Sequence, residues 1–266
     1  MMLGVIHYNT PGNTVEEFLK WAAFAGFESV ELAVHDVWPD KNQCGKGSTE
    51  EVAAMLKQFG LKCSALASGN DFVVLEPAAV EAQVARMKCI CELAQLLDCN
   101  VIRTEGGQPK DSVPQEKWVE AMAACCTASL DFLKPMGMKY AIDNHGYVTN
   151  DIGVMMGLLK AVDAPGIVGS NLDTMNVRWF GNTLEQCDQF YRDVAPWVLH
   201  THMKDGTGSR ETYHGRDLGN GEINLALALQ CLKDAGYDYA YTAEYEGKED
   251  RAIGYEKCLV WMKHKI

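Results

Sequence analysis

The chain has 266 residues, of which 47% are hydrophobic, and this is enough to bury the core of one large domain. Its formal net charge of -12 argues against a general attraction to nucleic-acid phosphates or to anionic membrane surfaces. The first residues carry no basic segment before a long apolar run, and no run of about 18 apolar residues occurs. We therefore expect a cytoplasmic protein that acts on a small molecule.

Short apolar runs alternate with longer segments of helical periodicity along the chain. In the first half, strands are predicted at 3–8, 29–34, 62–68 and 100–105, and helical segments at 14–26, 48–59, 77–97 and 114–135. Thr14 followed by Glu17 is typical of a capping box at the start of the first helix, and Gly26 is typical of its end.

The second half repeats this pattern four more times. Strands are predicted at 139–143, 167–173, 198–202 and 239–244, and the helices that follow them end near 162, 195, 235 and 263. A doubly wound open sheet gives the same alternation, but no glycine-rich phosphate-binding fingerprint follows the first strand. The pattern therefore predicts an α/β protein with a single (β/α)8 TIM-barrel domain over residues 1–266.

Polar residues recur at the carboxyl ends of the predicted strands, which converge on one mouth in a parallel barrel. Carboxylates in this shared, partly desolvated space repel one another unless a cation lies between them. A single histidine at a strand end is more often structural, but four candidate ligands on four successive strands favour a metal. Oxygen-rich ligation with one imidazole favours Mn²⁺, with Mg²⁺, Co²⁺, Zn²⁺ or Fe²⁺ as alternatives. The predicted ligands are Asp143, Asp173, His202 and Glu244.

The alternation in HTHMKD places His200 and His202 on the same face of the seventh predicted strand. His202 is nearer the mouth, so it is the predicted ligand. His200 is expected to lie deeper and to fill the barrel.

At these residues the chain resembles the xylose-isomerase-like TIM-barrel superfamily. The matching phrases are AIDNHG, NLDTMN, HTHMKD, LGNGEIN and GYDYAYTAEYEG, and they are specific as a set. The superfamily includes sugar-phosphate isomerases and epimerases, keto-sugar 3-epimerases, inosose dehydratases, C-glycoside deglycosidase catalytic subunits and, more distantly, endonuclease IV. An endonuclease would need more histidines and a basic surface, which this acidic chain lacks.

The resemblance implies the same four ligands, with one departure. Asp143 stands where the family usually carries glutamate, which weakens a scheme with two proton-transferring carboxylates and directs attention to His145. Glu105 lies near the position where the endonuclease relatives place another metal-binding histidine, so it is expected to support the metal or bind a hydroxyl group.

Such a site is suited to proton abstraction next to a carbonyl, with a metal-stabilised enediolate. The predicted base is His145 or Glu244, and Asp143 and Lys204 complete the predicted catalytic set. The predicted substrate contacts are His7, Glu105, Asn176, Arg178 and Glu246.

Three functions fit this set. The first is a sugar isomerase or epimerase. The second is a metal-dependent lyase that dehydrates a keto-sugar or inosose or eliminates a group from a 3-keto-glycoside. The third is a non-catalytic sugar-binding or partner subunit. We expect an unphosphorylated sugar or keto-sugar as the substrate, no nucleic acid or membrane partner, and a homo-oligomer or a partner subunit as the assembly.

Overall fold

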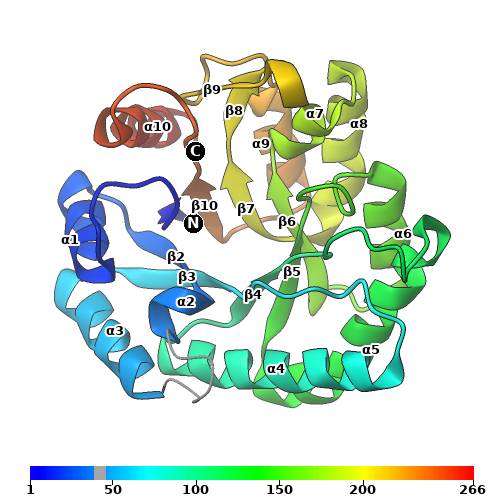
Figure 1. The fold of residues 1–266 in the computed structure, drawn as a ribbon. Helices are drawn as coiled ribbons and strands as arrows, with labels where there is room; N and C mark the ends of the chain where they lie inside the picture. Colours follow the sequence, from blue (N-terminus) through cyan, green and yellow to red (C-terminus); the bar gives the residue numbers. More distant parts are fainter. Residues whose placement is uncertain (39–45) are drawn as a thin grey trace.

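The computed structural model describes residues 1–38 and 46–266. Within these residues, eight parallel strands close into a barrel in the order β1-β10-β7-β6-β5-β4-β3-β2, and helices surround the ring of strands (Figure 1). The barrel strands are β1 (Met2–Ile6), β2 (Ser29–Ala33), β3 (Lys62–Ala67), β4 (Val101–Thr104), β5 (Lys139–Asp143), β6 (Val168–Asp173), β7 (Val198–Met203) and β10 (Ala240–Ala243).

The longer helices lie around the outside of the barrel (Figure 1). The α-helices are α1 (Val15–Ala25), α2 (Val34–Val37), α3 (Lys46–Phe59), α4 (Pro77–Leu96), α5 (Trp118–Met136), α6 (Ile152–Val162), α7 (Asn176–Phe180), α8 (Leu184–Val194), α9 (Leu225–Asp234) and α10 (Arg251–Lys265). Short 3-10 helices occupy Gln115–Lys117, Ala195–Trp197 and Arg210–Thr212.

Local sequence signals explain where α1 begins and ends. The Thr14 hydroxyl accepts a hydrogen bond from the Glu17 backbone N–H at 3.2 Å, and the Glu17 carboxylate accepts one from the Asn13 N–H at 2.7 Å. These bonds satisfy amide groups that have no partner within the helix. Gly26 takes the left-handed conformation, with φ 95°, and ends the helix, as its position in the sequence predicts.

The barrel interior contains its own apolar cluster. Ala65, Val101 and Ala141 pack with the partly buried Leu199 and Tyr239, separately from the large core that includes the helices. These residues lie on or beside β3, β4, β5, β7 and β10, and strands on opposite sides of the ring meet only across its interior. The interior is therefore packed, and it positions the charged residues that lie at and near the carboxyl ends of the strands.

The predicted TIM barrel is confirmed, and the strand boundaries differ from the predicted ones by at most two residues. The short helix α2, the division of the helical segment after β6 into α7 and α8, and a small sheet were not predicted. After β7 the chain forms β8 (Asp205–Thr207) and β9 (His214–Arg216), which pair as a two-stranded antiparallel sheet outside the barrel. Among the described residues, no helix has the length and apolar content needed to cross a membrane.

Candidate active site

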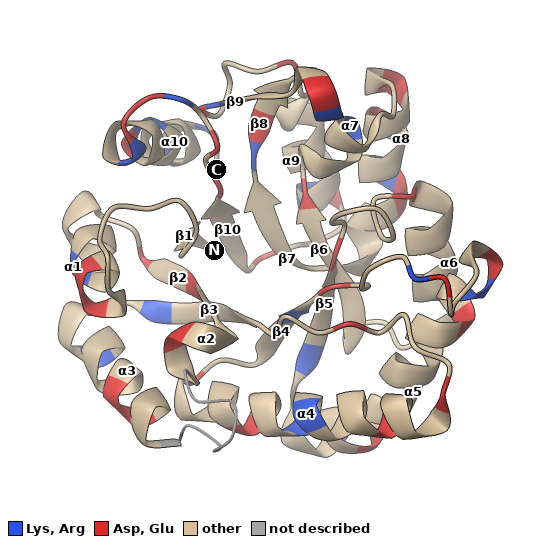
Figure 2. Cartoon of the chain, in the orientation of Figure 1, with Lys and Arg blue, Asp and Glu red and all other residues tan. Residues whose placement is uncertain are grey.

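A cavity of about 340 Å³ opens at the carboxyl ends of the barrel strands. Figure 2 shows acidic residues on several barrel strands, inside the ring of helices. The polar side chains that line the cavity come from strands all around the barrel or from the loops directly after them. They include Glu31, Arg103, Asp143, His145, His202 and Glu244.

Three of the four predicted metal ligands meet in what we call the donor group: Asp173, His202 and Glu244. One ligand atom of each lies within 4.8 Å of the others, and all three residues are buried. His202 Nδ1 lies 3.0 Å from Glu244 Oε2 and 3.9 Å from Asp173 Oδ2. Among the described residues, Asp173 Oδ2 has no hydrogen-bond partner, and the contact of His202 Nδ1 with Glu244 is not a well-directed hydrogen bond. Two buried carboxylates and an imidazole in this arrangement fit a divalent cation.

Asp173 is positioned by the start of α7. Its Oδ1 accepts hydrogen bonds from the backbone N–H groups of Met175 and Asn176, both at 2.8 Å, and this leaves Oδ2 directed elsewhere. Burial raises the pKa of Asp173 to about 7, and the nearby Glu244 carboxylate adds to this rise while Lys204 opposes it. A buried carboxylate with a raised pKa gains from a bound cation.

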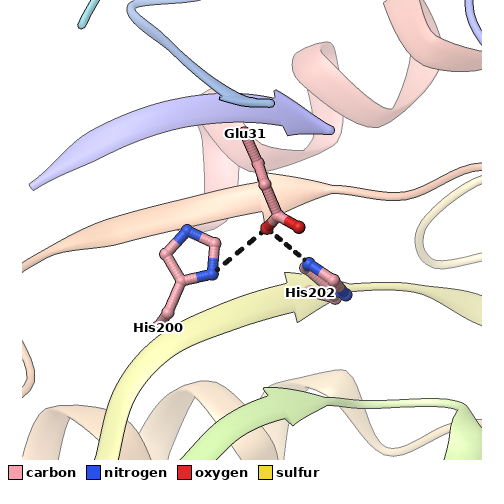
Figure 3. A group of neighbouring side chains, drawn as sticks. All are labelled: Glu31, His200 and His202. Atoms are coloured by element: carbon pink, nitrogen blue, oxygen red, sulfur yellow. Dashed lines mark hydrogen bonds and ion pairs between the residues drawn. The ribbon is translucent and has the colours of Figure 1, made fainter. Parts of the chain in front are cut away.

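Glu31 on β2 orients the imidazole of His202. It is fully buried, and its Oε2 lies 2.7 Å from His202 Nε2 and 3.5 Å from His200 Nδ1 (Figure 3). When Nε2 donates to Glu31, His202 Nδ1 is left facing Asp173 and Glu244, which is the usual carboxylate–histidine–metal arrangement. Burial alone would raise the pKa of Glu31, but the charges of His202 and Arg103 outweigh it and lower the pKa to about 2.

A second set of potential metal ligands, Glu31, His200 and His202, is also close together. In this set the Glu31 carboxylate is already paired with His202 and with Arg103 Nε, and His200 Nδ1 lies 2.8 Å from Asn171 Oδ1. We assign it to a hydrogen-bonded network. Burial lowers the pKa of His200 to about 4, so this fully buried ring is neutral and fills the barrel, as the sequence predicts.

Asp143 lies outside the donor group and belongs instead to what we call the Arg103 cluster: Glu31, Arg103 and Asp143. Arg103 Nη1 donates to Asp143 Oδ2 at 2.8 Å, and Arg103 Nε donates to Glu31 Oε1 at 2.7 Å. The second oxygen of Asp143 accepts from the Asn171 amide at 2.6 Å. Both carboxylate oxygens therefore have partners, and the role of Asp143 as a fourth ligand stays a prediction.

Lys204 lies among the carboxylates at the mouth. Its Nζ is 2.8 Å from Glu244 Oε1, 3.0 Å from Glu246 Oε2 and 3.8 Å from Asp173 Oδ2, and it donates to Asn176 Oδ1 at 3.3 Å. Burial alone would lower the pKa of Lys204, but the three carboxylates outweigh it and raise the pKa. Lys204 is thus a fixed positive charge that the predicted contacts Asn176 and Glu246 share.

His145 follows β5 and faces the cavity with a half-exposed side chain. Its Nδ1 lies 3.6 Å from Asp143 Oδ2. The loop is held by Thr149, whose hydroxyl donates to the Asp143 carbonyl at 2.6 Å and accepts from the His145 N–H at 3.2 Å. A positioned, accessible imidazole beside a carboxylate is suited to accept a proton and to stabilise the resulting charge.

The remaining predicted contacts differ in position. His7 lines the cavity, stacks on Phe18 with ring centroids 4.1 Å apart, and has its Nδ1 3.0 Å from Asp36 Oδ1. Glu105 Oε1 lies 3.8 Å from Arg103 Nη1, and Arg178 Nε donates to Glu222 at 2.7 Å. Among the described lining residues, neither Glu105 nor Arg178 is present, and their roles as substrate contacts stay predictions.

The sequence reasoning missed Glu31 and Arg103. Each is a charged residue within a short apolar strand, in the phrases SVELA and VIRT. Parallel strands in a barrel are covered on both faces, so a charge inside one requires a partner within the structure. A charged residue inside an apolar strand is therefore a sequence signal for a buried ion pair, and both residues carry it.

The family model described as xylose isomerase-like TIM barrel matches residues 19–265. The chain belongs to this family. This confirms the resemblance drawn from the sequence phrases. Comparison with curated proteins gives no match.

Solved structures share the fold at low sequence identity. The D-psicose 3-epimerase of Clostridium cellulolyticum H10, solved with D-tagatose, is 14% identical, with coverage of 100% of this chain and 99% of that chain and a TM-score of 0.80. The IOLI protein with a binding zinc atom is 17% identical, with coverage of 100% and 96% and a TM-score of 0.78. The probable 3-DHS dehydratase AsbF of Bacillus anthracis is 19% identical, with coverage of 98% and 99% and a TM-score of 0.73.

Proposed function

We propose that the chain is a divalent-metal-dependent isomerase or epimerase that acts on an unphosphorylated keto-sugar, with Mn²⁺ as the first candidate metal. The observation that carries this proposal is the donor group, in which the buried Asp173 Oδ2 lacks a hydrogen-bond partner among the described residues and His202 Nδ1 faces both carboxylates. Structural neighbours named as the IOLI protein with a binding zinc atom and as a D-psicose 3-epimerase support it.

Asp173, His202 and Glu244 would hold the cation. When bound, a divalent cation polarises a carbonyl and stabilises the negative charge that develops on its oxygen. Lys204 adds a second positive charge beside Glu244 and Glu246. We assign it the binding of substrate oxygens.

His145 is our proposed base. Its imidazole removes the proton from the carbon next to the carbonyl, and Asp143, 3.6 Å from Nδ1, stabilises the protonated ring. Return of a proton to the other face of the same carbon completes an epimerisation, whereas return to the neighbouring carbon completes an isomerisation. Glu244 is the alternative base, but its pairing with Lys204 and His202 lowers its pKa well below the usual value of a glutamate and makes it a weaker one.

The test is exchange of the substrate α-proton with solvent deuterium, followed by NMR with Mn²⁺ and a panel of keto-hexoses. We expect His145→Ala to slow exchange by about 100-fold or more while its metal content stays that of the parent protein. His264→Ala, which alters an exposed histidine of α10, is the matched control. Exchange at the parent rate in the His145 variant would remove this residue from the role.

A lyase is the second candidate, because the acid at the end of β5 is an aspartate paired with Arg103 and is followed by an accessible histidine. The family pattern has a glutamate at the position of Asp143, which would form a proton-transferring pair with Glu244, and this chain departs from that pattern. In addition, a structural neighbour is named as a probable dehydratase. In this case the same proton abstraction would be followed by loss of a β-substituent. Incubation with 3-keto-glycosides separates the two reactions, since a lyase releases a second product fragment that mass spectrometry detects.

A further inference from the structure

A cavity of about 520 Å³ opens at the amino ends of the barrel strands, opposite the candidate active site. Lys62, which begins β3, Asn100, just before β4, and Tyr239, just before β10, all line it. Half of the described lining residues carry sulfur, and these are Met2, Cys63, Cys99, Met136 and Met138. This cavity therefore offers thiols and thioethers, where the barrel mouth offers carboxylates and imidazoles.

The two thiols of this cavity lie side by side. β3 and β4 are parallel neighbours, and Leu66 of β3 pairs with Ile102 of β4. Continuing that register back by three residues places Cys63 beside Cys99. Neighbouring strands lie about 4.8 Å apart, which brings the two side chains into contact. Each thiol also donates to the backbone carbonyl two residues further along the chain, at 3.4 Å, so both side chains have a fixed direction.

The surroundings keep the pair protonated as long as no cation is bound. Cys63 is 4% exposed and Cys99 is 2% exposed. A hydrogen bond with Cys99, followed by burial, raises the pKa of Cys63 well above its usual value. Lys62 and Asp98 bring one charge of each sign to the cavity, and both are exposed. Two adjacent buried thiolates repel each other unless a cation lies between them.

We propose that Cys63 and Cys99 form a binding site for a soft, thiophilic cation, with Cu⁺ as its ligand. Thiolate and thioether donors select Cu⁺, whereas Mn²⁺ and Mg²⁺ prefer oxygen donors. A structural Zn²⁺ takes four donors such as cysteine and histidine, and no histidine is present among the described residues of the lining. The lining thioethers offer Cu⁺ a third sulfur.

The binding step needs no oxidant or reductant. The S–H bonds of Cys63 and Cys99 break, two S–Cu bonds form, and the two protons pass to solvent, while copper stays Cu⁺. The bound cation then joins β3 to β4 at the amino end of the barrel, and the donor group at the other end is free to hold its own divalent cation.

The test is anaerobic titration of the purified, reduced chain with Cu⁺, in competition with the chromogenic chelator bicinchoninate. We expect the chain to hold about one equivalent tightly. Cys63→Ser and Cys99→Ser should each weaken this binding by about 100-fold or more, because each removes a thiolate ligand. Serine keeps a donor for the carbonyl that each thiol contacts. Cys231→Ser, which alters a partly buried cysteine of α9, is the matched control and should bind Cu⁺ as the parent does.

Three results would overturn the proposal: no Cu⁺ held by the parent, an affinity in both single variants equal to that of the parent, or an equal loss in Cys231→Ser. Zn²⁺ bound by the same pair as tightly as Cu⁺ would overturn the assignment to a soft cation. Circular dichroism checks that each variant folds, and either single variant is sufficient if the other misfolds.

The same variants separate this site from the donor group. Asp173→Asn should bind Cu⁺ as the parent does, and Cys63→Ser should keep the parent affinity for Mn²⁺. Loss of Cu⁺ binding in Asp173→Asn would contradict a sulfur site at the amino end of the barrel.

Discussion

The Arg103 cluster and the donor group are neighbours at one barrel mouth, in contact through Glu31 and His202, and their buried carboxylates are neutralised in different ways. Each contains two buried carboxylates. In the Arg103 cluster, one guanidinium donates to both Glu31 and Asp143. In the donor group, among the described residues, Asp173 Oδ2 has no hydrogen-bond partner. Lys204 Nζ pairs with Glu244 at 2.8 Å but lies 3.8 Å from Asp173 Oδ2. Asp173 Oδ2 is therefore the carboxylate oxygen to which an external cation would contribute most.

The largest expected effect is on stability. Arg103→Met leaves two buried carboxylates without their shared cation, and we expect it to lower the free energy of unfolding by about 3 to 5 kcal/mol. Urea unfolding followed by circular dichroism measures this. Arg192→Met, which alters an arginine of α8 in an exposed hydrogen bond, should change little. Adding Asp143→Asn to the Arg103 variant should recover part of the loss, and no recovery would show that the two residues are not coupled.

The next effect concerns metal affinity and tests the difference between the two groups directly. We expect Asp173→Asn to weaken Mn²⁺ binding by roughly 100-fold or more, because it replaces a ligand carboxylate. Asp143→Asn should weaken it by less than about 10-fold, because this carboxylate is engaged with Arg103 and Asn171. Calorimetric titration measures both. Equal losses would restore Asp143 to the ligand set that the sequence predicts.

The smallest effect concerns the orientation of His202. Glu31→Gln keeps a hydrogen-bond acceptor for His202 Nε2 but removes the negative charge, so we expect Mn²⁺ affinity to fall by about 10-fold. Glu28→Gln, an exposed glutamate that accepts from the Leu3 N–H, is the control and should bind Mn²⁺ as the parent does. An unchanged affinity in the Glu31 variant would mean that it does not support the metal through His202.

The barrel could be predicted because its information is local. Strand and helix periods, the Thr14 cap and the glycine helix ends specify each unit, and closure follows from eight repeats of it. The donor group could be predicted because residues at the ends of parallel strands meet at one mouth. These inferences need only the order of elements.

The Arg103 cluster could not be predicted in the same way, since it depends on pairing across the barrel. Glu31 and Arg103 lie 72 residues apart, and their strands are not neighbours in the ring. The sequence alone does not indicate which acid Arg103 neutralises. The pairing of Asp143 with Arg103 could therefore not be predicted from the sequence. The shorter side chain of Asp143 was nevertheless already the one departure from the family pattern.

The donor group is carried by a backbone ladder. Asp173 pairs in register with His202, His202 with Thr242, and the Glu244 N–H donates to the Met203 carbonyl at 3.0 Å. A neighbouring cavity of about 410 Å³, which includes Trp179 and Tyr213 in its lining, is walled instead by loops and by the short helix α7. Mutation can thus reshape the loops, and with them the choice of substrate, while the strands keep the spacing of the donors unchanged. Such a division lets one ancestral scaffold diversify in specificity without rebuilding its reactive centre.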